Sequence, residues 1–242
     1  YRTFGGFAFQ VPFLSVSGHF HTHRRHWDAR APTVFDQYLD WVRGRNRTFG
    51  YLHIGDIHEP IDLPKLYLRR HGVDTDIDDI SRWDYLTPDD SNDAKRYRCH
   101  RRRLYRAAVD YVDDCINEFM QRLDDTVGDD PVVIVTSDHG EAMWEHTEFD
   151  AERFHSPRGV YGVGHGATPY EAVTRVPLCV RGLSVTDGPA SLVDITPTLL
   201  DRLCSSYPSE MSGESLGGSR DSDRVLLTES ARYGSEKRAV YT

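Results

Sequence analysis

One apolar run constrains the fold of this chain more than any other feature. Residues 132–136, Val-Val-Ile-Val-Thr, are apolar without alternation and rich in β-branched side chains, a pattern typical of a strand that helices cover on both faces. The run stops abruptly at Ser137, Asp138, His139 and Gly140. The polar residues that follow a strand of this kind lie at its carboxyl end, which is the edge where open parallel sheets bind ligands.

The elements around this run predict an α/β fold. Residues 96–125 carry apolar side chains at a spacing of three and four, which indicates a long amphipathic helix. Further predicted helices and strands alternate with it, so we expect a mostly parallel sheet flanked by helices on both faces. The other predicted helices cover residues 33–43, 63–70 and 194–203, and the other predicted strands cover 48–54, 175–180, 224–230 and 238–242.

Charge and composition exclude several partners. The net charge of the 242 residues is −9, with 27 Asp and 11 Glu against 26 Arg and three Lys. Such acidity repels phosphate backbones, so we expect no nucleic-acid partner. The Asp-rich, Lys-poor balance resembles that of proteins from salt-loving archaea, and a GC-rich genome is the alternative explanation. The run Arg101-Arg102-Arg103 is interpreted as a solvated helix face rather than an anion site.

Two further features concern the compartment. No window approaches 18 apolar residues and no signal peptide is recognisable, so we expect no membrane span and a cytoplasmic location. The four cysteines show no C-x-x-C spacing, which argues against a thiolate zinc site and predicts free, half-buried thiols. They are Cys99, Cys115, Cys179 and Cys204.

Metal-competent side chains follow two of the predicted strands. Asp56 and His58 come after residues 48–54, and Asp138 and His139 come after residues 132–136. Carboxylate oxygens and imidazole nitrogens are both ligands for divalent cations. For the Asp138–His139 pair alone, a turn closed by the Asp side chain with a surface His is the plain structural alternative.

Four blocks resemble a known family. They are "YLHIGDIHEP", "SDHGEAMWEH", "GVGHGATPYEAVTRVPL" and "SLVDITPTLLD", in this order. Together they look like the sulfatases and, more broadly, the alkaline phosphatase superfamily, and the match covers about residues 48–216. The resemblance implies a sulfatase-like α/β fold, hydrolysis of anionic sulfate esters, and a divalent cation, expected to be Ca²⁺ with Zn²⁺ or Mn²⁺ as alternatives.

The resemblance also implies residue roles. Asp138 and His139 match the pair that holds the cation, while His58 and His165 match residues that bind the ester and take part in catalysis. Glu141 and His146 are expected to lie just beyond the residues that bind the cation and to orient those residues. In addition, the resemblance gives Arg175 a structural role and makes Asp194 the start of a helix.

The chain departs from the family pattern in two ways. The Cys-x-Pro-x-Arg or Ser-x-Pro-x-Arg block that supplies the family's formylglycine nucleophile is not found in residues 1–242. We therefore expect this chain to be a partial catalytic domain, cut at both ends and inactive as given. His139 stands where many sulfatases have Asn, which keeps open a phosphodiesterase, phosphonate hydrolase or phospho-group transferase. A non-catalytic relative that binds anions or a partner is the third hypothesis.

Overall fold

The computed structural model describes residues 2–3, 21–22, 30–73, 90–128, 131–203, 210–230 and 232–242. The chain divides into two compact units, and each is described by itself. The first, which we call the helical unit, comprises Tyr1–Asp84 and Asp90–Asp130. The second, the strand unit, comprises Tyr85–Asp89 and Pro131–Thr242.

The helical unit is built on one long helix, α3, which spans Asn92–Val127. It begins where the Ser91 hydroxyl accepts a hydrogen bond from the Ala94 amide at 3.1 Å, an N-cap that satisfies one of the helix's open donors. It ends at Gly128, whose φ of 74° is the left-handed conformation that glycine adopts without a steric cost. The prediction of a helix over 96–125 is confirmed, and the helix extends further at both ends.

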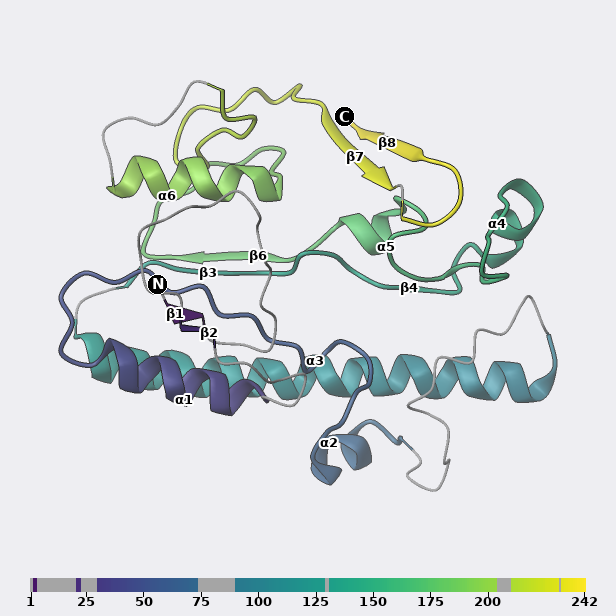
Figure 1. Cartoon of the computed structure of the whole chain (residues 1–242), viewed down its shortest axis with the longest axis horizontal. Coiled ribbons are helices and arrows are strands. Elements are labelled where there is room, and N and C mark those ends of the chain that lie inside the picture. The colour runs from purple at the N-terminus through teal and green to yellow at the C-terminus, as the bar shows by residue number, and fades with distance from the viewer. Residues whose placement is uncertain are drawn as a thin grey trace. The chain divides into compact units, whose positions relative to one another are not determined.

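Two shorter helices pack on α3 (Figure 1). Helix α1, Ala31–Val42, stacks Phe35 on Phe119 with ring centroids 4.4 Å apart. Helix α2, Lys65–Arg70, sets Tyr67 edge-on against Tyr111 at 5.1 Å. Each fully buried aliphatic or aromatic side chain in such a contact contributes about 1.5–3 kcal/mol. The core at α2 and α3 contains Ile61, Leu63, Val73, Leu104, Ala107, Ala108, Tyr111 and Val112.

Two predictions for this unit are wrong. Residues 48–54 form a single β-bridge at Leu52 rather than a strand, and Phe49 and Tyr51 are exposed. A strand needs a neighbour for its backbone groups, and among the described residues this segment makes only that one bridge. Arg101 is not on a solvated face either, because it is buried and forms an ion pair with Glu59. The remaining described strands of the unit, β1 (Arg2–Thr3) and β2 (His21–Thr22), pair in parallel.

The strand unit is organised around β3, Val133–Thr136, and β6, Leu178–Arg181. They pair antiparallel, with Val133 opposite Arg181 and Thr136 opposite Leu178. The expected mostly parallel sheet is therefore wrong for this pair. A parallel return requires a crossover that carries the chain back to the starting edge, whereas the chain here turns through short elements and comes back from the far end of β3 (Figure 1). In addition, β3 is half-buried, not covered on both faces.

Short elements fill the connection between β3 and β6. The strands β4 (Ala142–Met143) and β5 (Val163–Gly164) pair antiparallel, with Ala142 opposite Gly164. Helix α4, Thr147–Arg153, lies between these strands in the chain, and α5, Glu171–Thr174, follows β5.

The remaining elements match their predictions. The 3₁₀ helix η1, Leu192–Asp194, leads into α6, Ile195–Leu203. Ser191 and Asp194 form a reciprocal capping box, so the prediction that Asp194 starts a helix is confirmed. Strands β7, Leu226–Ser230, and β8, Lys237–Tyr241, form an antiparallel hairpin near the C-terminus.

Two expectations about the whole chain can be compared with the described residues. No helix in the described ranges is both long enough and apolar enough to cross a membrane. Cys99, Cys115 and Cys179 are free thiols, as predicted, although Cys99 and Cys179 are exposed rather than half-buried. Cys204 lies outside the described residues.

Candidate active site

The loop after β3 is held by its own polar groups. The Ser137 hydroxyl donates to the His139 carbonyl oxygen at 2.6 Å, and the His139 amide donates to the Asp138 carboxylate at 3.0 Å. This second bond joins adjacent residues and is not the turn that the structural alternative predicted, in which the Asp side chain accepts from the amide two residues on; the Gly140 amide donates to Val173 instead. The Asp138 side chain is 69% exposed and is therefore open to a ligand.

Gly140 brings this loop against the segment after β5. Its amide donates to the Val173 carbonyl oxygen at 2.7 Å, and a Cβ at this position would lie 2.2 Å from the Ala172 carbonyl oxygen. Such a contact is impossible for any residue with a side chain, so the glycine is required for close approach of two backbones. The Asp138–His139 pair is thereby fixed to α5.

The pairing of β4 with β5 brings Glu141 and His165 together. Because Ala142 lies opposite Gly164, the residues just outside the ladder, Glu141 and His165, face each other. His165 Nδ1 is 3.0 Å from Glu141 Oε2. The His165 ring also stacks on the His139 ring, with centroids 3.8 Å apart and an angle of 27° between the planes.

The Glu141–His139–His165 group, which we call the HEH cluster, is largely screened from water. The side chains of Glu141 and His165 are 12% and 19% exposed, and that of His139 is 31% exposed. Glu141 Oε1 is buried and has no hydrogen-bond partner among the described residues. A buried carboxylate oxygen without a donor is costly, and a bound cation would satisfy it.

The donors at this loop suit a divalent cation, which the family resemblance implies. The HEH cluster offers two ring nitrogens and a carboxylate oxygen, all within 4.8 Å of one another. Asp138 adds a second carboxylate, whose Oδ1 is 3.8 Å from His139 Nε2. Asp138 and His139 would hold such a cation, and the cation would supply positive charge to an anionic ester.

One predicted site residue, His146, and one predicted structural residue, Arg175, differ from their expected places. His146 is exposed, and its ring lies 4.2 Å from the ring of Tyr170 instead of joining the HEH cluster. Tyr170 in turn donates to Asp150 at 2.6 Å, and burial together with this bond raises the pKa of Tyr170. Arg175, expected to support the fold, is 80% exposed and pairs with Glu171 at 2.6 Å.

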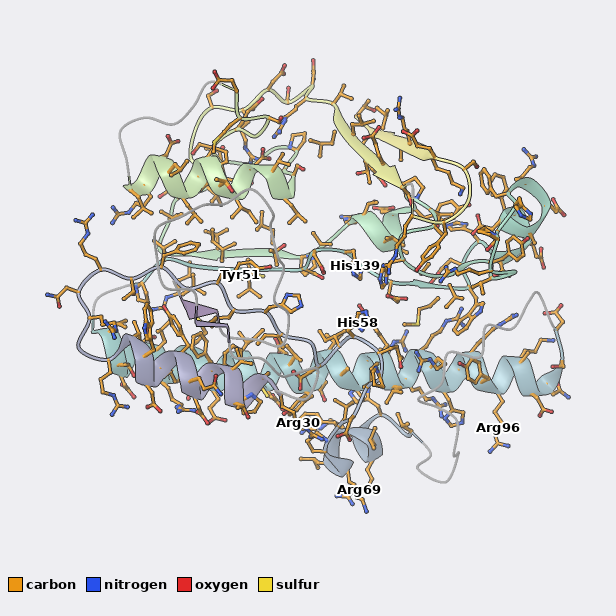
Figure 2. All side chains as sticks on the ribbon, in the orientation of Figure 1. Arg30, Tyr51, His58, Arg69, Arg96 and His139 are labelled. Carbon is orange, nitrogen blue, oxygen red and sulfur yellow. The ribbon has the colours of Figure 1, made fainter. Side chains whose placement is uncertain are left out.

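His58 belongs to the helical unit and is labelled there in Figure 2, as His139 is in the strand unit. Its amide donates to the Gly55 carbonyl oxygen at 3.0 Å, and its Nδ1 lies 2.7 Å from the Glu59 carbonyl oxygen. A carbonyl only accepts, so Nδ1 carries the hydrogen and Nε2 carries the lone pair. Nearby Asp56 accepts from the Ala31 amide at 2.9 Å, and burial raises the pKa of Asp56.

Sequence reasoning missed two features of these loops. It treated Glu141 as a residue outside the cation's contacts, whereas its carboxylate is inside the HEH cluster. It also missed Glu59, which the ion pair with Arg101 holds beside His58. A signal for the second existed, because Arg101 lies three and seven residues before Leu104 and Ala108 and therefore shares their buried face.

Comparison with known proteins identifies the family. The family model described as Sulfatase matches residues 12–205. The chain belongs to the sulfatase family. This confirms the resemblance of the four blocks to the sulfatases, and the family implies an α/β fold.

The curated relatives are similar over part of their length. The chain is 30% identical over 134 residues to the uncharacterized sulfatase YidJ of Escherichia coli K12, covering 54% of this chain and 24% of that protein. It is 33% identical over 121 residues to arylsulfatase K of Danio rerio, covering 48% and 20%. It is 27% identical over 121 residues to the multifunctional alkaline phosphatase superfamily protein PehA of Trinickia caryophylli, covering 48% and 21%. The chain thus spans about a quarter or less of these relatives.

Proposed function

We propose that residues 1–242 form part of the catalytic domain of a metal-dependent hydrolase of sulfate esters, a sulfuric ester hydrolase. The observation that carries the proposal is the Asp138–His139 pair, which the loop after β3 presents in a chain that belongs to the sulfatase family. Breaking a sulfate ester builds negative charge on the leaving oxygen and the sulfuryl group. A cation on this pair would stabilise that charge.

The remaining roles are proposed from the resemblance. His58 would bind the sulfuryl group or protonate the leaving oxygen, since an imidazole titrates near neutrality. His165 would bind the same anion, and Glu141 would orient His165 through the 3.0 Å contact between Nδ1 and Oε2. The exposed His146 would act from further out. Ca²⁺ is the cation expected from the resemblance, and the imidazole of His139 favours the alternatives Zn²⁺ and Mn²⁺.

A second reaction is favoured by one specific residue. His139 stands where many sulfatases have Asn, so the same site is a candidate phosphodiesterase, phosphonate hydrolase or phospho-group transferase. The similarity to PehA supports this alternative. Both reactions need a cation and anion-binding residues, and they differ in the ester that reacts fastest.

The test is hydrolysis by the product of the complete coding sequence in which these residues occur. We compare matched 4-nitrophenyl esters: the sulfate, a phosphate diester and a phosphonate. The assays run at both low and molar KCl, because the Asp-rich composition favours a protein from a salt-loving archaeon. The sulfate ester is expected to react fastest. A faster phosphate diester or phosphonate would replace the first reaction with the second.

The matched variants are Asp138→Ala and, as a control, Asp201→Ala at an exposed position of α6. Loss of a cation ligand removes several kcal/mol of charge stabilisation, so the first variant should lose at least about 100-fold in kcat/KM. The control should keep the parent rate. Full activity in Asp138→Ala, or no hydrolysis of any of these esters, would make the non-catalytic binding hypothesis the better one.

A further inference from the structure

We propose that His139, Glu141 and His165 bind one late first-row divalent cation, with Zn²⁺ as the type ion. The proposal gives Glu141 and His165 a role that the family resemblance does not, because it makes them ligands of the cation rather than its surroundings. It concerns binding by the strand unit and does not depend on which ester is hydrolysed.

The distances among the donors support the proposal. In the described part of the chain, this group brings three metal-ligating side chains within 4.8 Å of one another. His165 Nδ1 and Glu141 Oε2 are 3.0 Å apart. Ligands at about 2.0–2.2 Å around a tetrahedral Zn²⁺ are separated by about 3.3–3.5 Å. Small side-chain shifts therefore suffice to bring this pair into one coordination sphere.

The tautomer of His139 leaves the right nitrogen for a cation. Its Nδ1 lies 2.8 Å from the Gly140 carbonyl oxygen, and a carbonyl only accepts, so Nδ1 carries the hydrogen. The lone pair is then on Nε2. A ligating His commonly donates its other ring N–H to a backbone carbonyl in this way, which fixes the ring orientation.

Glu141 supplies the observation that points most directly to a ligand. Its side chain is 12% exposed, and Oε1 has no donor among the described residues. The contact with His165 is made by the other oxygen of Glu141, Oε2. A cation coordinated by Glu141 would satisfy the oxygen that the protein leaves unsatisfied and would neutralise a carboxylate largely removed from water.

The stacking of the two rings adds a condition. Planes only 27° apart do not aim two nitrogen lone pairs at one point, so at least one ring must rotate when the cation binds.

The donor set selects among cations. Two imidazole nitrogens and one carboxylate suit Zn²⁺ and its neighbours in the first transition row. Ca²⁺ prefers six to eight oxygen ligands, and the HEH cluster offers one carboxylate. Zn²⁺ should therefore bind here in preference to Ca²⁺.

The experiment is calorimetric titration of the chain, prepared without a polyhistidine tag and stripped with a chelator, with ZnCl₂ alone. The parent is compared with His165→Ala, Glu141→Gln and the matched control His155→Ala, an exposed histidine of the same unit. We expect His165→Ala to lose one equivalent of bound Zn²⁺ relative to the parent and the control. We expect Glu141→Gln to bind that equivalent at least about 10-fold more weakly. Because zinc held by other histidines survives in every variant, the lost equivalent identifies this site.

Two further measurements keep the result interpretable. The visible spectrum of bound Co²⁺ should change in His165→Ala and not in His155→Ala, and circular dichroism checks that each variant is folded. If His165→Ala does not fold, His165→Asn replaces it. Unchanged zinc stoichiometry in a folded His165 variant, or displacement of the zinc by an equal concentration of Ca²⁺, would overturn the proposal. Zinc binding without ester hydrolysis would count only against the proposed function, and Ca²⁺-dependent hydrolysis without this zinc site only against the present inference.

Discussion

Two carboxylates of the strand unit, those of Asp194 and Glu141, have opposite surroundings. Asp194 is fully buried and receives donors on both oxygens: Arg224 from one side at 2.7 and 2.8 Å, and the amides of Ser191 and Glu214 at 2.8 and 2.9 Å. Among the described residues, Glu141 has one hydrogen-bonding partner, His165, and one oxygen without a donor. A carboxylate saturated by the protein's own donors holds the fold together, whereas one left unsaturated is available to a ligand.

The surroundings of Asp194 also act on its titration. Burial alone would raise its pKa, but the hydrogen bonds from Arg224 and the two amides outweigh burial and lower the pKa of Asp194. The hydrogen bond with Asp194 likewise raises the pKa of Arg224. Both shifts favour the charged forms, as expected for an ion pair joined by two hydrogen bonds.

The largest effect is expected from breaking this pair. Asp194→Asn removes the fully buried, hydrogen-bonded counter-charge of Arg224 and leaves it only the more distant Glu214, whose Oε1 is 3.7 Å from Nε. Removing one partner of a buried ion pair typically costs about 3–5 kcal/mol. Hydrogen exchange in increasing urea, followed on peptides that cover α6, gives the free energy of unfolding of this region. Asp201→Asn, at an exposed position of the same helix, is the matched control. A loss of unfolding free energy no larger than that of the control would show that Asp194 is not needed for stability. The contrast between Asp194 and Glu141 would then no longer hold.

A smaller effect is expected from acid. Folding lowers the pKa of Asp194, so its stabilisation is complete above the unfolded value of about 3.9 and is lost as the pH falls through the lower folded pKa. The parent should therefore lose stability faster than Asp194→Asn on acidification in this range. The check is the difference in unfolding free energy between the two proteins, measured at a series of pH values. A difference that stays constant down to the acid limit would contradict the assigned shift.

The sequence predicted the parts that local patterns determine. Helix α3 follows from apolar residues at helical spacing, and the start of a helix near Asp194 follows from the block that resembles the family. Residues 48–54 carry apolar and aromatic side chains suited to a strand, but a strand depends on a distant neighbour and the described segment makes one bridge. The antiparallel direction of β6 likewise depends on the path of the connection from β3.

The candidate site likewise contains residues that local sequence patterns could identify and residues that they could not. Asp138 and His139 are adjacent in the chain and belong to a recognisable block, so the sequence was enough to select them. Glu141 and His165 meet only because two-residue strands pair across α4. Strands so short leave no periodicity to read. The Arg224 partner of Asp194 is also remote in sequence, 30 positions away, and no local signal connects the two.

The smallest effect is expected at Glu141, and it decides whether the comparison holds. Glu141→Gln keeps the shape of the side chain, removes a buried charge and exchanges the charged acceptor of His165 for a neutral one. One weakened hydrogen bond is offset by the relief of desolvation, so the unfolding free energy of the metal-free chain should change by less than about 1 kcal/mol. The measurement is hydrogen exchange in urea with a chelator present, on peptides covering β4 and β5, with the exposed Glu148→Gln of α4 as control. Should Glu141→Gln cost as much as Asp194→Asn, Glu141 would be a structural carboxylate like Asp194, and its unsatisfied oxygen would no longer argue for a ligand. A small change, together with weaker zinc binding by the same variant, would separate the residue's part in binding from its part in folding.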